Sequence, residues 1–215
     1  MNNDPGIECY RHCIDKNIFC FNTPVNCHVC TRSLSNSACI PVRVPYPFVR
    51  GSQQPCSIII KTTEGDFLNT YQLMDDLHIG ITTSKCVIVS FDWNGITKDV
   101  NLNNWNECLV ILQLKEINWE PLWDNVLSDI IKSERWNSIR YNEETHNCFS
   151  FVMDFMKQFN FLKTFIHSIK TREEFTEMYV APSIIKAQKY INLYRKIVEN
   201  GFYIYNQVSN EILCT

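Results

Sequence analysis

The residue best placed for chemistry in this 215-residue sequence is Cys148. It lies in the segment YNEETHNCFSF (141–151), where Thr145 or Asn147 could cap a helix and leave the thiol in its first turn. Free backbone N–H groups and the positive end of the helix dipole favour a thiolate there. The same N–H groups could hold the oxyanion that forms when a thiolate attacks a carbonyl group. This placement is typical of a nucleophilic cysteine.

A thiolate nucleophile also needs a proton shuttle, and His78 is the residue we expect in that role. It precedes Cys148 by 70 residues, in the strand-like run LHIGITT (77–83), where a rigid sheet could present the imidazole. The competing interpretation is structural, because free cysteine is among the most buried residue types and a strand histidine often only fills the core. The polar residues that could support the pair are Ser90, Asp92, Asn94 and Asn147.

The N-terminal cysteines suggest a second kind of chemistry, metal binding. Cys27 and Cys30 have the Cys-x2-Cys spacing that lets two thiolates clasp one zinc ion. Two further ligands would have to come from His12, Cys13, Cys20, His28, Cys39 or Cys56. We predict one structural zinc held by Cys13, Cys27, Cys30 and Cys56. The alternative is a reduced, cysteine-rich core segment without a metal.

The composition indicates in which cellular compartment and with which class of partner we expect this protein. Twenty Lys and Arg residues against 23 Asp and Glu residues give a net charge of −3, so no overall basic field favours nucleic acid. The N-terminus has no basic region followed by an apolar run, and no apolar run approaches the roughly 20 residues that span a bilayer. We therefore expect a protein of the cytoplasm or the nucleus, where its 11 cysteines stay reduced.

The elements that must position these residues follow from hydrophobic periodicity. Runs rich in β-branched residues predict four strands, at 57–63, 77–83, 86–93 and 107–114. The second and third of these are close enough in sequence to form a hairpin. Two amphipathic runs predict helices over 121–136 and 148–159. The first should bury Leu122, Val126, Ile130 and Ile131, and the second Phe151, Val152, Phe155, Met156 and Phe159. This order of strands and helices indicates an α+β fold.

The flanking segments differ from this body in composition. Residues 1–56 hold seven of the 11 cysteines and six of the eight prolines. Residues 165–215 read as helical, with capping-box spacing at 171–174 and a stop at Asn200-Gly201 before a final strand candidate. The face of the long helix should carry Ile184, Ala187, Ile191, Tyr194 and Val198. We predict three parts: a Cys-rich segment over 1–56, a core over 57–164 and a helical extension over 165–215 that packs on the core.

The central motifs resemble a known group of hydrolases. A strand histidine, the segment FDWNGI (91–96) and the helix-opening pattern YN-x3-HNC-x2-F are similar to the desumoylating isopeptidase (PPPDE) group. The resemblance implies a permuted papain-like fold in which an antiparallel sheet packs on a Cys-bearing helix. It also implies a His78–Cys148 dyad that cleaves an isopeptide, peptide or thioester bond, with a ubiquitin-like protein as partner or substrate. One departure is Phe149, because Asn or Glu usually follows the cysteine in that group.

A second resemblance extends over nearly the whole chain. DLHIGIT (76–82), HNCFSF (146–151), EFTEMYVAP (174–182) and YINLYRKIVENGFYI (190–204) are similar to the makorin-2 opposite strand protein family. This resemblance implies membership of a family and carries no activity with it. The alternative to a thiol hydrolase is therefore a catalytically inactive domain that keeps the fold and binds a protein partner.

Overall fold

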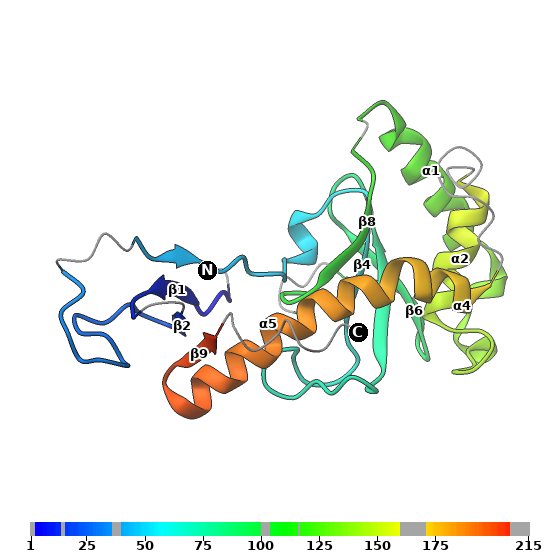
Figure 1. Ribbon diagram of the computed structural model, residues 1–215. Coiled ribbons are helices and arrows are strands. Elements are labelled where there is room, and N and C mark those ends of the chain that lie inside the picture. The colour runs from blue at the N-terminus through cyan, green and yellow to red at the C-terminus, as the bar shows by residue number, and fades with distance from the viewer. Residues whose placement is uncertain are drawn as a thin grey trace. The chain divides into compact units, whose positions relative to one another are not determined.

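The chain divides into two units in the computed structural model, which describes residues 3–13, 16–35, 40–99, 104–115, 117–159 and 171–206 (Figure 1). Unit 1 is Phe48–Ala187, and unit 2 combines Asn3–Pro47 with the chain from Gln188 onward. Both contain antiparallel sheets, so the predicted α+β class is confirmed. The division differs from the three predicted parts because the end of the chain returns to the N-terminal sheet. Local periodicity carries no signal of that long-range pairing.

Unit 1 is built on a five-stranded sheet with the order β7-β6-β5-β4-β8. The strands are β4 (Ser57–Thr62), β5 (Leu77–Thr82), β6 (Ile88–Asp92), β7 (Gly95–Asp99) and β8 (Leu109–Gln113). The four predicted strands and the β5–β6 hairpin are confirmed, and each pair is antiparallel. β7 adds a fifth strand through the tight turn at Trp93-Asn94.

Two helices, α1 (Glu120–Ile131) and α2 (Cys148–Gln158), pack side by side in unit 1. All five residues of the predicted apolar face of the second helix are buried. The predicted face of α1 is wrong in part: the buried residues are Trp123, Leu127 and Ile130, while Leu122 is 43% exposed. The face turns because the Trp123 indole N–H donates to the Thr82 carbonyl oxygen at 2.8 Å.

Short helical turns connect these elements: η1 (Gly51–Gln53), η2 (Ile117–Trp119), η3 (Glu134–Trp136) and η4 (Ser138–Arg140). A longer helical stretch then runs through α4 (Arg172–Phe175), one π turn (Thr176–Val180) and α5 (Ala181–Asn200). The predicted capping box is confirmed at Thr171 and Glu174. Among the described residues, no helix has the length and apolarity needed to cross a membrane.

α5 passes from unit 1 into unit 2 at Ala187. Of its predicted face, Ile184, Ala187 and Ile191 are buried, whereas Val198 is 59% exposed and Ile197 is buried in its place. Gly201 follows with φ +79, the left-handed conformation that ends the helix as predicted.

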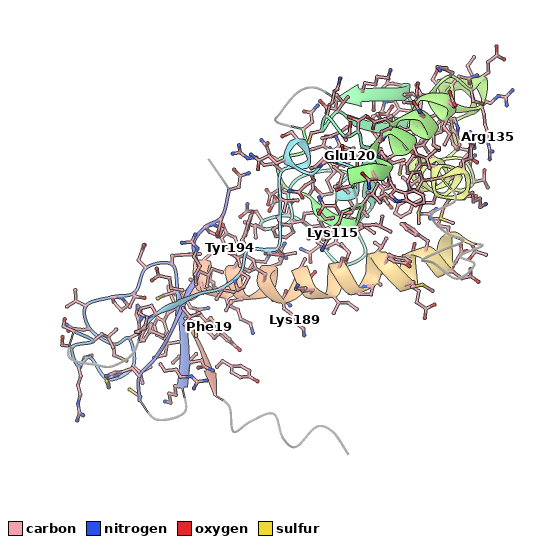
Figure 2. The ribbon with its side chains drawn as sticks, turned by 90° about the horizontal axis from the view of Figure 1, so that it is seen from above. Phe19, Lys115, Glu120, Arg135, Lys189 and Tyr194 are labelled. Atoms are coloured by element: carbon pink, nitrogen blue, oxygen red, sulfur yellow. The ribbon has the colours of Figure 1, made fainter. Side chains whose placement is uncertain are left out.

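Unit 2 holds a four-stranded sheet with the order β3-β1-β2-β9. Its strands are β1 (Glu8–Arg11), β2 (Lys16–Cys20), β3 (Val42–Arg43) and the predicted final strand, β9 (Tyr203–Asn206). β2 pairs with β9, so that Phe19 lies opposite Tyr203; Figure 2 labels Phe19. Tyr10, Ile18, Cys20 and Cys27 form a small buried cluster. A core of this size favours an additional stabilising element in this unit, such as a bound metal ion.

Candidate metal centre and the His78 and Cys148 sites

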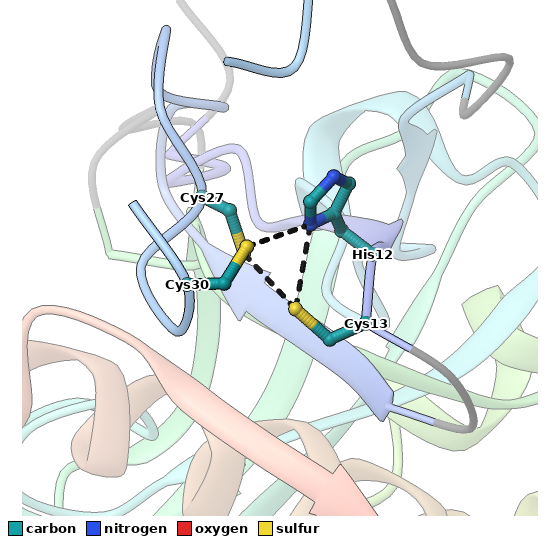
Figure 3. A group of neighbouring side chains, drawn as sticks. All are labelled: His12, Cys13, Cys27 and Cys30. Carbon is teal, nitrogen blue, oxygen red and sulfur yellow. Dashed lines mark hydrogen bonds between the residues drawn. The ribbon is translucent and has the colours of Figure 1, made fainter. Parts of the chain in front are cut away.

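Four side chains of unit 2, from His12, Cys13, Cys27 and Cys30, converge on one point (Figure 3). Their ligand atoms all lie within 4.8 Å of one another. The His12 Nδ1 atom is 3.4 Å from Cys13 Sγ and 3.3 Å from Cys30 Sγ, and the Cys13 and Cys27 Sγ atoms are 3.9 Å apart. A tetrahedral zinc site with the usual bond lengths has ligand separations of about 3.5 to 3.8 Å. The cluster therefore has the dimensions of a Cys3His metal site.

The Cys27–Cys30 half of the cluster is a tight turn. The Thr31 backbone N–H donates to the Cys27 carbonyl oxygen at 2.9 Å, and the Val29 N–H donates to Cys27 Sγ at 3.4 Å. Thr31 has φ 60, in the left-handed region that costs a β-branched residue energy. The turn thus directs both sulfur atoms to the same side, at the expense of local strain.

The other half of the cluster comes from two adjacent residues that follow β1. Neighbouring side chains of a strand point to opposite faces, so His12 and Cys13 would not normally share a ligand. Cys13 has φ 60, and this left-handed backbone turns its thiol back to the imidazole of His12. Two of the four non-glycine residues with positive φ, among those described, therefore lie at this cluster.

The thiols of the cluster differ in their pKa values. Burial opposes ionisation of Cys27, yet the N–H groups of Cys30 and Val29, with the Cys30 and His12 side chains, lower the pKa of this thiol to about 6. The hydrogen bond with Cys30, burial and the neighbouring Cys27 raise the pKa of Cys13 to about 11. One sulfur of the set is thus prepared to be a thiolate, the form that binds metals.

A second layer of side chains holds the turn in place. The Tyr10 hydroxyl accepts from the His28 backbone N–H at 3.2 Å and pairs with His28 Nδ1 at 2.9 Å. The His28 ring stacks on Phe202 at 4.6 Å between centroids. His28, which the sequence offered as a ligand, is therefore a supporting residue of the turn.

The predicted ligand set needs one correction: His12 takes the place of Cys56. Cys56 belongs to unit 1, at the residue before β4, and burial with the nearby Asp124 and Glu120 raises its pKa to about 12. His12 was among the candidate ligands but was left out of the predicted set, because strand alternation does not anticipate the turn at Cys13. Cys20 is buried in the core of unit 2, and Cys39 lies outside the described residues.

In unit 1, strand register places the His78 side chain. His78 lies opposite Lys61, and its ring is 5.6 Å from that of Trp105. The alternate residues Ile79 and Ile81 point to the other face, which also carries Phe91 through the Ile81–Val89 pair. Phe91 packs on Trp136, and Trp136 packs on Phe151 of α2. His78 therefore faces the Trp105 side of the sheet, whereas α2 covers the opposite side.

His78 and two of its predicted supporting residues, Ser90 and Asp92, line one cavity. Burial and the Lys61 charge lower the pKa of His78 to about 4, although the Asp92 charge raises it by a smaller amount, so the imidazole is neutral at pH 7. The Ser90 hydroxyl is 2.8 Å from that of Thr97. Asn94 is exposed in the following turn and is absent from the lining of this cavity.

Cys148 is the first residue of α2, as predicted, and Asn147 is its cap. The Asn147 side chain accepts from the backbone N–H groups of Phe149 at 3.0 Å and Ser150 at 3.2 Å. Burial raises the pKa of the thiol, although the N–H groups of Ile79 and Phe149 and the charge of Arg172 oppose this. Among the described residues, no hydrogen bond joins Cys148 to His78. Their joint action in catalysis stays a prediction.

Comparison with known proteins gives the family of the chain. The DUF4796 N-terminal model matches residues 5–34, which include all four residues of the His–Cys cluster, and the DUF4796 C-terminal model matches residues 41–197. The human MKRN2 opposite strand protein is 34% identical over 207 residues, which cover 91% of this chain and 87% of that protein. No solved structure matches the chain. The resemblance to makorin-2 opposite strand proteins is confirmed by this relative, and the chain belongs to the DUF4796 family.

Proposed function

We propose that this protein is a zinc-containing binding protein. Unit 2 holds one structural Zn²⁺ through His12, Cys13, Cys27 and Cys30, and unit 1 binds a protein partner without cleaving it. The observation that carries the zinc assignment is the set of ligand separations, 3.3, 3.4 and 3.9 Å. A closed set of four protein ligands favours a structural role for the metal, because catalytic zinc keeps a position open for water or substrate.

Three observations favour binding over hydrolysis in unit 1. The Cys148 thiol is 6% exposed and its pKa is raised by burial. The His78 side chain faces the side of the sheet away from α2. A papain-like thiolate needs the opposite arrangement, a low-pKa thiol in hydrogen-bond reach of its base. We therefore regard unit 1 as a papain-like domain that does not use a His78–Cys148 dyad.

Exposed apolar side chains supply a surface for a partner. Trp93 is 65% exposed in the turn between β6 and β7, and Ile139 in η4 is 93% exposed. The two segments adjoin, because a Cβ atom on Gly95 would lie 3.2 Å from the Ser138 nitrogen. Tryptophan is enriched among residues that dominate binding energy. The PPPDE resemblance makes a ubiquitin-like protein the partner we propose.

Titration of ubiquitin into isotope-labelled protein tests this part of the proposal. We expect saturable shifts of the backbone amide signals of β7 and η4, and their loss in a Trp93→Ala, Ile139→Ser double variant. Met74→Ser, which removes a side chain that is 92% exposed elsewhere in unit 1, is the matched control and should bind normally. Absence of saturable shifts in the wild type would refute a ubiquitin-like partner.

A thiol hydrolase is the second candidate, because Cys148 begins α2 beside the backbone N–H groups of Ile79 and Phe149. Alkylation by iodoacetamide, with each thiol identified by peptide mass spectrometry, separates the two candidates. We expect slow labelling of Cys148 that rises with pH and is the same in His78→Ala, with the less buried Cys86 as internal reference. Rapid labelling at pH 6 that depends on His78 would establish the hydrolase instead.

A further inference from the structure

We propose that unit 1 binds a small, flat organic carboxylate in the cavity of about 360 Å³ on the Trp105 side of its sheet. Lys61, His78, Ser90, Asp92, Trp93 and Trp105 are among its lining residues. The volume lies at the lower end of the range for ligand pockets, which suits a single ring with one acidic group. This site is separate from the proposed zinc ion and from Cys148.

The Lys61 ammonium group is the first reason to expect an anion. It lies 5.3 Å from the centre of the Trp105 ring, which attracts the cation but does not neutralise it. Among the described residues, none forms an ion pair or hydrogen bond with this ammonium group. An ammonium group without a hydrogen-bond acceptor gains from a ligand that accepts charge-assisted hydrogen bonds, and a bound carboxylate supplies such an acceptor.

The second reason is the His78 imidazole, directly across the β4–β5 pair from Lys61. Neither of its nitrogen atoms has a hydrogen-bond partner in the described part of the chain, and His78 lines the cavity, where a ligand could bind to it. The neutral ring offers one N–H donor. A carboxylate with one oxygen toward this N–H and the other toward Lys61 would satisfy both groups.

The remaining lining residues define the shape and charge of the ligand. Trp105 is 4% exposed and Trp93 is largely exposed, and both line the cavity. A flat ring could stack on the Trp105 indole and keep its other face toward water. Among the lining residues, Asp92 and Asp99 balance the charges of Lys61 and Lys98, so a ligand with two negative charges would leave a larger net negative charge in the site than a monoanion. The site should therefore favour a monoanionic carboxylate over a phosphate dianion.

Calorimetric titration of the full-length protein with three probes tests the proposal. We expect saturable binding of indole-3-carboxylate, and binding of indole-3-carboxamide and phenyl phosphate that is weaker by at least about tenfold. Lys61→Gln should weaken the carboxylate to the level of the carboxamide. Lys115→Gln is the matched control: it removes the same charge from an exposed residue that follows β8 and is absent from the cavity lining (Figure 2).

A second readout uses the imidazole itself. The charged groups that face His78 are Lys61 from β4, Asp92 from β6 and Lys98 and Asp99 from β7. A bound carboxylate favours the imidazolium form, so saturation with indole-3-carboxylate should raise the pKa of His78 in an NMR titration. Equal affinity for the carboxamide, tighter binding of phenyl phosphate, or an unchanged His78 titration would each overturn the proposal. The wild-type comparisons decide the matter even where Lys61→Gln fails to fold.

Discussion

Loss of His12 is the perturbation that tests the zinc assignment most directly, because the sequence pattern alone favours Cys56 instead. Structural zinc sites contribute an apparent 10 to 16 kcal/mol of binding free energy, or about 2.5 to 4 kcal/mol for each of four ligands. His12→Ala should therefore weaken zinc about 10²- to 10³-fold. Cys27→Ser, which removes a sulfur from the same cluster, should have a similar effect.

The assay is competition for zinc between the full-length protein and a chromophoric chelator, with metal content measured on the purified protein. Wild type should hold one zinc ion per chain. Cys56→Ala and Cys9→Ser should keep that ion, because neither residue is in the cluster. Retention of tight zinc by His12→Ala, together with its loss in Cys56→Ala, would refute the ligand set derived from the structure.

The part of the chain that loses stability when zinc is removed is a second measurable consequence of the ligand set. Among the described residues, the buried cluster of unit 2 has four members, and Cys13, Cys30 and Phe202 pack against it. Removal of zinc should therefore increase hydrogen exchange in β1 and β2, while the amides of β4 and β5 in unit 1 keep their protection. Unchanged exchange of β1 and β2 after chelation would show that the ion does not stabilise the unit.

Three further predictions concern unit 1, each measured by urea denaturation. The His78 pKa is about 4 in the folded chain and near 6.5 when unfolded, so the unfolded state binds the extra proton as pH falls through this window. Wild type should lose about 2 kcal/mol between pH 7 and pH 5 beyond any loss in His78→Gln, and equal losses would contradict this. Asn147→Ala should cost about 0.5 to 2 kcal/mol, because α2 loses its cap, whereas Asn94→Ala in an exposed turn should cost much less. Phe155→Ala should cost about 3 to 5 kcal/mol, since this ring is 1% exposed and packs 4.7 Å from Trp123; a smaller cost would mean that the core collapses around the gap.

Much of unit 1 was predictable from local pattern. The run SIIIKT forms β4 and the Phe-rich run after Cys148 forms α2, because burial of β-branched and aromatic side chains dominates both. Unit 2 was largely unpredictable. Its strand β2 pairs with β9, whose residues lie more than 180 positions further along the chain, and no local signal encodes such a pair.

The candidate metal site could also be predicted only in part from the sequence. The Cys27–Cys30 spacing was visible because a tight turn brings residues three apart together. His12 was a candidate but was not chosen, since only the left-handed backbone of Cys13 lets the Cys13 thiol and the His12 imidazole reach the same point. The adjacent pair His12-Cys13, two ligand types side by side, was the signal in the sequence that favoured including His12.

The face of His78 was also encoded in the sequence. In LHIGIT the apolar residues Leu77, Ile79 and Ile81 alternate with His78 and its neighbours, so a strand packed on an apolar helix turns the isoleucines toward that helix. A one-residue slip of register would bring His78 to the α2 side but would move Ile79 and Ile81, both 0% exposed, away from it. Exposure of two isoleucines costs about 3 to 6 kcal/mol, much of the stability of a typical domain. A register slip is therefore too costly for a catalytic cycle. β4 pairs with β5 from Leu77 to Ile81, with Lys61 opposite His78, so the ladder on that side also holds His78 in a register that keeps it away from Cys148.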